Sequence, residues 1–329
     1  MKYIIHITII LVLSNLAHSE NEAVTKVATC AANWLKIENG VRGISMGGSQ
    51  VASGRGMTGV HYNPAALAFI KGSEVFYSKS YYLADISHNT LAYGTRLSPT
   101  DYFGLHLFYL NSGSMAVTTE EEPDGTGEFF QVMNLSLRLT YARQLTDRLR
   151  VGGALKYIRE QIFTAYMQSF VFDIGSNFDT GIYGMILGMS VSNFGPDVQF
   201  HGEGLEIVVS DTTSRDGKLS KITKKFSVPL TFRLGIQKDV WIGGVDDMDR
   251  LTMSIDGINP IDYIVYGGLG VEYSWRDMAY VRGGTRIGHD TAGLSVGGGV
   301  KIRGIMVDYA YVNYGILNET HQFGISLEF

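Results

Sequence analysis

Hydrophobic and polar residues alternate along the chain from about residue 74 to its end. The segment RLTMSIDG places Leu251, Met253 and Ile255 on one side of an extended chain and more polar residues on the other. The segments VPLTFRLGIQ, GIMVDYAYVNY and HQFGISLEF repeat this pattern. A period of two residues predicts β-strands that have one apolar face and one polar face.

The alternation predicts fourteen strands separated by turn sequences. They are expected to begin near residues 74, 87, 101, 129, 148, 169, 183, 228, 249, 263, 278, 291, 304 and 320. Most extend for about 10 to 13 residues, a length that suits a tilted strand crossing a membrane. An even number of such strands is typical of a single-chain bacterial outer-membrane barrel.

The connections between these strands form two sets that alternate along the chain. One set is short, with the sequences SPT, LTD, TGI and RD and a tight turn at Arg303. Its exception is the longer stretch around Asp246, Asp247 and Asp249. The other set includes the two longest connections, 113–128 and 195–227. Short periplasmic turns and long extracellular loops predict an all-β, 14-stranded antiparallel transmembrane β-barrel over residues 73–329.

A secreted β-sandwich would also show alternation, so it remains the competing fold class. Aromatic residues at strand ends favour the barrel, because such side chains suit the interfaces of a membrane. These residues are Tyr81, Tyr82, Tyr102, Trp275, Tyr311 and Tyr314. Charged residues lie on the polar face, which becomes the lumen of a barrel and requires pairing or hydration there. The predicted lumen-facing charges are Arg138, Lys156, Asp173, Arg233, Asp256, Glu272, Arg282, Arg286, Lys301 and Asp308.

The start of the chain predicts export. Lys2 precedes the apolar run IIHITIILVL, and small residues follow at Ala17 and Ser19, which is the pattern of a signal peptide over residues 1–19. The apolar run is too short to span a bilayer as a helix. The predicted location is the bacterial outer membrane. The net charge is −5 and no basic block is present, so the sequence gives no indication of nucleic-acid binding.

Residues 20–72, between the signal peptide and the first strand, do not alternate. The segment TKVATCAANWLKI predicts a short helix, whereas GVRGISMGGSQVASGRGMTGV is too rich in glycine for a stable element. Pro64 then fixes a bend and restricts Asn63 before it. A segment of small residues can fold back and fill the lumen, and a periplasmic linker is the alternative interpretation.

The sequence AANWLKIENGVRGISMGGSQVASGRGMTGVHYNPAALA resembles the N-terminal signature of the PorV/PorQ family of outer-membrane proteins. The closing segments GVEYSW, VRGGTRIGHDTAGLSVGGGVKI and VDYAYVNYGILNETHQFGISLEF resemble the last strands of the same family. That family is similar to the FadL class of fourteen-stranded barrels, which carry an N-terminal hatch. The resemblance implies that residues 40–72 form a plug inside the barrel. The residues that match its motif are Gly43, Met46, Gly47, Gly48, Asn63, Pro64 and Ala65.

The sequence departs from the family pattern at two places, which limits the family contacts that can be expected in this chain. Ser45 stands where the family more usually has glycine, and the segment SGRG replaces a typically acidic stretch. Any contact that depends on those carboxylates is therefore not expected in this chain. The middle of the chain, above all 195–227, offers no match to the family.

The sequence gives little support for catalysis. The histidines are scattered without HExxH or paired-ligand spacing, and Ser45 and Ser49 lie outside any nucleophile elbow. The acidic segment EEEPDGTGE lacks the spacing of a calcium loop and is interpreted as a solvated loop. We therefore expect no enzyme activity, no metal site and no cofactor.

Two functions remain after catalysis is set aside. The PorV branch acts in type IX secretion, and the resemblance implies a protein that binds exported cargo with its extracellular loops. The alternative is FadL-like passage of a hydrophobic small molecule, with the hatch as a gate. The partners expected from these hypotheses are outer-membrane lipid, secreted cargo with type IX secretion components, and a hydrophobic ligand.

Overall fold

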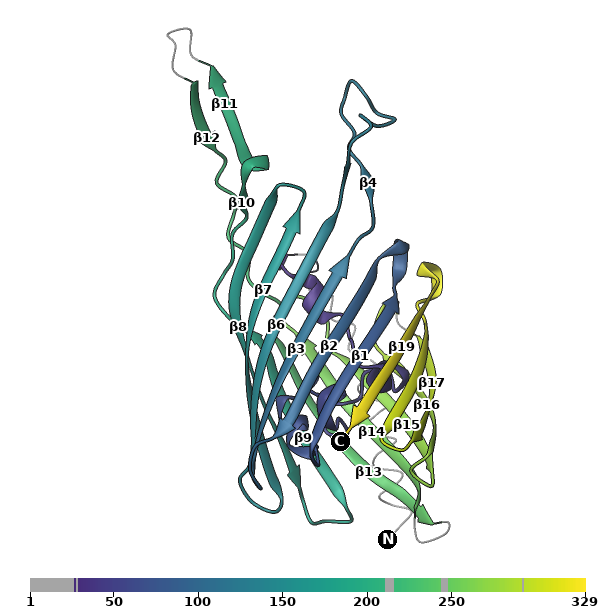
Figure 1. Ribbon diagram of the computed structural model, residues 1–329. Helices are drawn as coiled ribbons and strands as arrows, with labels where there is room; N and C mark the ends of the chain where they lie inside the picture. The colour runs from purple at the N-terminus through teal and green to yellow at the C-terminus, as the bar shows by residue number, and fades with distance from the viewer. Residues whose placement is uncertain (1–26, 28, 211–215, 244–247, 292) are drawn as a thin grey trace.

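The computed structural model of the protein describes residues 27, 29–210, 216–243, 248–291 and 293–329. Fifteen strands form one antiparallel sheet; all but the short β10 make up a closed barrel of fourteen strands (Figure 1). Pairing of β1 with β19, from Glu74 opposite Glu328 to Tyr81 opposite His321, closes the barrel. The predicted fold class is confirmed. The barrel strands are β1 Ser73–Tyr81, β2 Ser87–Arg96, β3 Asp101–Asn111, β6 Val132–Gln144, β7 Leu149–Ile162, β8 Ala165–Asp179, β9 Met185–Phe194, β13 Thr231–Gly243, β14 Asp249–Pro260, β15 Tyr266–Trp275, β16 Ala279–Ile287, β17 Leu294–Ile302, β18 Ile305–Asn313 and β19 Glu319–Glu328.

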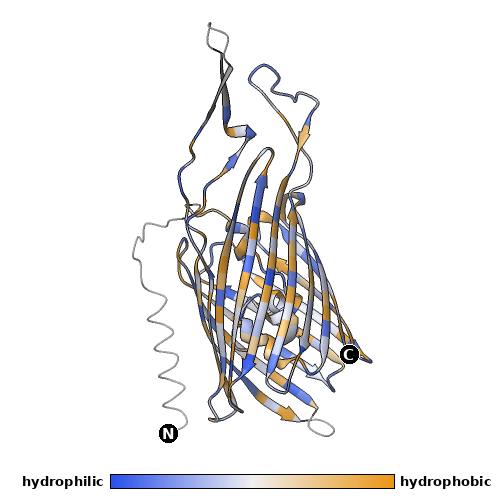
Figure 2. Cartoon of the chain, turned by 60° about the vertical axis from the view of Figure 1, so that its left-hand side comes forward, coloured by the Kyte–Doolittle hydropathy of each residue, from blue (hydrophilic) through white to orange (hydrophobic). Residues whose placement is uncertain are grey.

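The two faces of each strand differ as the alternation predicted. On β13, Phe232, Leu234 and Ile236 point outward and are about half exposed, whereas Thr231 and Arg233 point inward and are buried. Figure 2 shows the resulting succession of hydrophobic and hydrophilic positions along the strands. An apolar outer face around a polar interior is the arrangement that a barrel needs in a lipid bilayer.

The strand ends differ from the prediction where a loop forms pairs of its own. A strand was expected from about residue 129, but the barrel strand β6 begins at Val132 because Phe129–Phe130 (β5) pairs with Met115–Ala116 (β4) instead. Strand β8 begins at Ala165, earlier than the predicted residue 169, because its first residues pair with β7 across a tight turn. The alternation therefore located the strands but not where their pairing stops.

The barrel has two unlike ends. The turn end carries the connections 97–100, 145–148, 180–184, 276–278 and 303–304. Arg303 and Gly304 both have positive φ, as a two-residue hairpin turn requires. The opposite loop end carries the long connections 112–131 and 195–230 and the short helices η3 Leu83–Asp85, η4 Glu203–Leu205 and η6 Gly315–Leu317. The hairpins β4–β5 and β11–β12 project beyond this end (Figure 1).

The longer loop at the loop end, 195–230, contains three short strands. They are β10 His201–Gly202, β11 Glu206–Ser210 and β12 Asp216–Ser220. Strand β10 pairs with the first residues of β8, so this loop begins as a continuation of the barrel wall. Strands β11 and β12 pair only with each other, as a separate two-stranded sheet.

The segment before β1 folds back into the lumen as a hatch, which we define as residues 30–72. It contains the helices η1 Asn33–Lys36, α2 Val41–Ser45, α3 Gly56–Gly59 and η2 Pro64–Phe69. The prediction that its glycine-rich stretch forms no stable element is wrong, because α2 and α3 form within it. Within the described part of the helix predicted over residues 25–37, only the four residues of η1 are helical. None of the described helices is long and apolar enough to span a membrane.

Glycines of the barrel wall allow the hatch to approach closely. A Cβ atom on Gly284 of β16 would lie 2.2 Å from the carbonyl carbon of Met46. A Cβ atom on Gly188 of β9 would lie 2.2 Å from the carbonyl oxygen of Val51. Such distances exclude any side chain, so both strands need glycine at these positions. These contacts, rather than helix propensity, hold the short helices of the hatch in place.

Some sequence predictions are changed by the hatch or lie outside the described residues. Tyr102 was expected at a membrane interface, but it is buried in the lumen against the hatch residues Met57 and Leu67. Tyr81 and Trp275 are exposed at strand ends, as an interfacial position requires. The predicted signal peptide, residues 1–19, lies outside the described residues, as do Asp246 and Asp247.

Candidate functional site

The hatch is attached to the barrel wall by ion pairs that cross the lumen. Three ion pairs each join a hatch residue to a residue of the wall or of a loop, with N–O distances of 2.6 to 2.8 Å. The pairs are Lys36 with Asp262, Glu38 with Arg286, and Arg42 with Glu272. In each pair the barrel residue is largely buried, so solvent screens these attractions less than it would on a surface.

The residues of the predicted Asn-Pro-Ala motif form a hydrogen-bonded turn. The Asn63 side chain donates to the carbonyl oxygens of Val51 at 2.7 Å and Ser176 at 3.0 Å. Its amide oxygen accepts from the backbone N–H of Ala65 at 3.0 Å, which caps helix η2. Pro64 occupies the first turn of that helix, where its missing N–H costs nothing. The motif therefore joins the hatch to β8 of the wall.

The glycine-rich part of the predicted motif lies on the opposite wall. Gly43 faces the ring of Tyr62 inside the hatch, and Met46 is fully buried. Gly47 and Gly48 have positive φ values of 64° and 81°, which glycine adopts readily. The N–H of Gly47 donates to Ser295 Oγ on β17 at 3.0 Å.

The predicted lumen-facing charges lie on the inner face, and most of them form buried pairs. Asp173 forms ion pairs with Lys156 at 2.7 Å and with Arg138 at 3.3 Å. Arg282 lies between Glu272 and Asp308, with N–O distances of 2.6 and 2.5 Å. Opposite charges arranged in this way offset part of the cost of removing each group from water.

The other predicted charges make different contacts. Asp256 accepts the backbone N–H of Val51 in the hatch at 2.8 Å, and Arg233 is buried beside Ser192 on the neighbouring strand. Arg286 binds hatch residue Glu38 as described above. Lys301 differs from the rest, because it lies at the turn end and its partner Glu328 is half exposed.

Below the hatch, the turn end encloses a cavity of about 1010 Å³ that we call the vestibule. Hatch residues Arg42 and Arg55 form part of its ceiling, and charged or polar residues of β1 and β13–β19 line its walls. Both acidic and basic side chains line it, among them Glu74, Asp239 and Lys301. Such a lining suits water and ions and does not suit a hydrophobic molecule.

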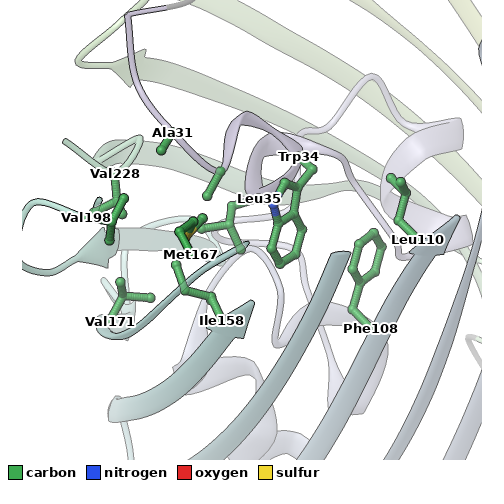
Figure 3. Close-up of a cluster of buried hydrophobic side chains, with 11 residues drawn as sticks. Ala31, Trp34, Leu35, Phe108, Leu110, Ile158, Met167, Val171, Val198 and Val228 are labelled. Atoms are coloured by element: carbon green, nitrogen blue, oxygen red, sulfur yellow. The ribbon is translucent and has the colours of Figure 1, made fainter. Parts of the chain in front are cut away.

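At the loop end, the N-terminal part of the hatch and the wall form an apolar cluster instead (Figure 3). Trp34 of the hatch stacks on Phe108 of β3, with ring centroids 5.8 Å apart and an angle of 4° between the ring planes. Buried aliphatic side chains surround this pair; they are Leu35, Leu110, Ile158, Met167, Val171, Val198 and Val228. Near the loop end, the side of the lumen formed by β3, β7 and β8 is therefore apolar, whereas the Lys36–Asp262 and Glu38–Arg286 pairs lie toward β14–β16.

A single carboxylate enters the apolar cluster. Glu160 Oε2 accepts hydrogen bonds from Trp34 Nε1 at 3.1 Å and from the backbone N–H of Ala32 at 3.0 Å. Below this cluster, His61 Nε2 and His106 Nδ1 have no hydrogen-bond partner within the described residues. Burial, together with the nearby charge of Arg138, lowers the pKa of His61, so its ring is neutral at pH 7.

Sequence reasoning missed the hatch charges Glu38 and Arg42 and the pair formed by Trp34 and Glu160. Glu160 could have been found, since it follows Lys156 and Ile158 on the inward face of β7 with a spacing of two residues. Trp34 gave no such signal, because its segment does not alternate. Among the described residues, no group of three His, Cys, Asp or Glu side chains is placed to hold a metal ion.

The chain matches no protein-family model and no curated protein sequence. Its fold is similar to solved outer-membrane structures. The Pseudomonas putida toluene transporter TodX has a TM-score of 0.58 and 13% identity, and the match covers 88% of this chain and 96% of TodX. The CymD monoaromatic hydrocarbon channel has a TM-score of 0.55 and 13% identity over the same shares of both chains. A Pseudomonas aeruginosa FadL homologue has a TM-score of 0.53 and 13% identity, covering 88% of this chain and 98% of the homologue.

These three structures share their architecture with the chain over nearly their whole lengths, while their sequences differ at most positions. The similarity therefore concerns the fold. None of the three is described as a PorV or PorQ protein or as an enzyme. The protein has a FadL/TodX-like fold, a fourteen-stranded outer-membrane β-barrel with a hatch in its lumen.

Proposed function

We propose that the protein is an outer-membrane channel that takes up a hydrophobic small molecule at its loop end. The observation that carries this proposal is the buried apolar cluster around Trp34 and Phe108, inside the lumen near its loop end. An apolar pocket with few polar groups is the usual form of a site for small hydrophobic ligands. The names of the structural relatives, a toluene transporter and a monoaromatic hydrocarbon channel, support the same class of ligand.

In this proposal the signal peptide over residues 1–19 directs the chain to the outer membrane, and residues 20–72 and 73–329 are the plug segment and the barrel. The loop end faces the exterior and the turn end faces the periplasm. The hatch then separates the apolar cluster from the charged vestibule, so a hydrophobic molecule is held above it. Passage requires either a movement of the hatch or an exit through the barrel wall.

Uptake of labelled naphthalene by bacterial cells that carry the protein in the outer membrane tests the proposal. Phe108→Gln places an amide in the apolar cluster and is expected to slow uptake. Leu105→Gln is the matched control, because Leu105 lies on the same strand but points outward and is 40% exposed. Equal uptake by cells with the wild-type protein and the Phe108→Gln variant would contradict the proposal.

A second candidate function is the PorV/PorQ-like one, binding of exported cargo in type IX secretion. The projecting hairpins β4–β5 and β11–β12 favour it, because they extend beyond what a channel needs for its wall. Removal of residues 117–128 would then abolish co-purification of secreted proteins from the outer membrane, as measured by mass spectrometry. If the same secreted proteins still co-purify with the shortened chain, the β4–β5 hairpin does not bind cargo.

A further inference from the structure

The N-terminal part of the hatch lies in the apolar cluster in the way that a ligand would. Trp34 is 7% exposed, and its ring lies parallel to that of Phe108 in an offset stack. The neighbouring Leu35 is buried in the same cluster beside Ile158 and Met167 of the wall (Figure 3). A flat ring among aliphatic side chains, oriented by few polar contacts, is a common arrangement of bound ligands.

The polar contact at this position depends on the hatch segment alone. Trp34 Nε1 and the N–H of Ala32 both donate to the same oxygen, Glu160 Oε2. Among the described residues, no cation pairs with this largely buried carboxylate, although most other buried acids of the lumen have one. If the segment withdrew, Glu160 would lose both donors, and an apolar pocket with one acceptor would remain. An unpaired buried acceptor disfavours that state until another donor replaces them.

The contacts of this segment with the barrel are separate from those of the rest of the hatch. Besides Glu160, its contacts with the barrel include the hydrogen bond from the Ala31 N–H to the Ser227 carbonyl at 3.0 Å and the Lys36–Asp262 ion pair. Ala32 has φ of 53°, in the left-handed region that disfavours a residue with a Cβ atom. From residue 38 onward, Glu38, Arg42, Met57 and Asn63 all bind the wall directly. Residues 38–72 therefore keep their own wall contacts if residues 30–37 leave, and the inference below requires that they do.

We propose that residues 30–37 are a built-in occupant of the ligand site, and that the ligand is a neutral, flat aromatic molecule carrying one N–H or O–H donor. This inference rests on the proposed function, because it requires that the lumen binds a small hydrophobic molecule. The ligand ring takes the place of Trp34 on Phe108, and its donor binds Glu160 Oε2.

The chemistry of the site separates this class from others. A fatty acid brings a second negative charge to Glu160, which repels it. A pure hydrocarbon can enter the apolar pocket, but it displaces the two donors and leaves the carboxylate unpaired, so it binds more weakly than a ligand that carries a donor. An indole or a phenol satisfies both parts of the site, since it supplies a ring and a donor together.

Binding of indole and of indene tests the inference, because indene has nearly the same shape and lacks the N–H group. Both are titrated calorimetrically into the full chain in lipid nanodiscs. Trp34→Ala empties the site and is expected to bind indole about tenfold more tightly than the wild-type protein does. Trp34→Phe keeps the ring on Phe108 and is the matched control, for which we expect a much smaller gain.

A second substitution tests whether Glu160 accepts the hydrogen bond from the ligand's N–H or O–H donor. In the Trp34→Ala protein, replacing Glu160 by Leu is expected to lower the ratio of indole affinity to indene affinity about tenfold. Indene should bind both proteins to a similar extent. An indole affinity of the Trp34→Ala protein no higher than that of the wild-type protein would overturn the built-in occupant. An unchanged ratio in the Glu160→Leu protein would overturn the donor requirement.

The experiment also separates this inference from the proposed function. Equal binding of indole and indene by the Trp34→Ala protein contradicts the inference and leaves a hydrophobic binding site in place. Absence of binding for both, with no naphthalene uptake by cells, contradicts the proposed function itself.

If Trp34→Ala fails to fold, the wild-type chain supplies the readout. Trp241 and Trp275 are replaced by Phe, so that the fluorescence comes from Trp34 alone. Its emission maximum should shift to longer wavelength when phenol is added and stay unchanged with toluene. A shift with toluene and none with phenol would contradict the inference.

Discussion

Arg42 in the hatch and Glu272 on β15 form a two-pronged ion pair across the lumen. Arg42 Nη2 lies 2.8 Å from Glu272 Oε1, and Arg42 Nε lies 2.9 Å from Glu272 Oε2. The same carboxylate accepts Arg282 at 2.6 Å, and Arg282 in turn binds Asp308 on β18. One hatch residue is thereby coupled to three strands of the wall. Bidentate pairs of this kind fix geometry as well as adding attraction.

Replacing Arg42 by Ala is expected to loosen the hatch. Arg42 also donates to Gln50 Oε1 and to the carbonyl oxygen of Ser53, so the change removes contacts within the hatch as well as the ion pair. Glu272 keeps Arg282 as a partner, which limits the loss. We expect the free energy of unfolding to fall by about 2 to 4 kcal/mol. Urea unfolding of the protein in phospholipid vesicles measures this change.

Lys301→Ala is the matched control for this prediction. Lys301 forms an ion pair with Glu328 at 2.9 Å, but this pair lies at the open turn end and Glu328 is half exposed. Solvent-exposed pairs contribute about 0 to 1 kcal/mol, so this variant should unfold almost like the wild-type protein. Equal effects of the two substitutions would show that Arg42 does not anchor the hatch.

The barrel was predictable from the sequence because one physical rule acts on every strand. Lipid outside and a polar lumen inside force alternation, so positions such as Phe232, Arg233 and Leu234 reveal which side each residue faces. The ends of strands follow a different rule, because they depend on the partner strand and on loop pairing. The β4–β5 pair, which delays the start of β6, shows why those boundaries could not be predicted.

The structure of the hatch could not be derived in the same way. Helix α2 has five residues and α3 has four, too few to be stable without neighbours. Their positions depend on wall residues that lie far away in the sequence, such as Ser295 for Gly47 and Ser176 for Asn63. Local sequence patterns carry no information on such contacts. The resemblance to a known family supplied the expectation of a plug where the residue pattern alone left a linker as an alternative.

Gly284→Ala is expected to interfere with the seating of the hatch. A Cβ atom on this inward-facing residue of β16 would lie 2.2 Å from the backbone of Met46 and 2.3 Å from that of Gly47. Neither backbone atom can move without shifting α2, so we expect a loss of about 1 to 3 kcal/mol in unfolding free energy. Thermal unfolding followed by circular dichroism measures the loss.

The neighbouring Gly283 provides the control for this test. Its side-chain position faces outward, where an added Cβ would meet its nearest atom, the Ser295 carbonyl oxygen, at 4.0 Å. Gly283→Ala should therefore be neutral or slightly stabilising, since alanine restricts the unfolded chain. A protein that tolerates alanine equally well at both positions would contradict the close contact between α2 and β16.

Asn63→Asp tests the turn that joins the hatch to β8. The substitution keeps the oxygen that caps Ala65 but replaces the amide donor with a second oxygen, which then faces the carbonyl oxygens of Val51 and Ser176. Burial of an unpaired acceptor or charge is costly, and we expect at least about 2 to 4 kcal/mol of destabilisation. Asn63→Ala should lower the free energy of unfolding less than Asn63→Asp does, because it adds no charge.

Asn89→Ala is the control. It removes an exposed hydrogen bond to Tyr77 and should change the free energy of unfolding by less than about 0.5 kcal/mol.

Deletion of residues 40–70 tests whether the hatch closes the lumen. This segment fills the space between the apolar cluster and the vestibule, and its residue Arg42 forms an ion pair with Glu272 of the wall. Without it, the inner face exposes charged and polar side chains such as Arg282 and Asp308, so water and ions should enter. We expect a stable ion conductance in planar lipid bilayers where the wild-type protein gives little.

Deletion of residues 117–128 in the β4–β5 loop is the control. It shortens the chain without unblocking the lumen and should leave the conductance low. If both deletions conduct alike, or if neither does, the hatch is not the barrier to ions in this barrel.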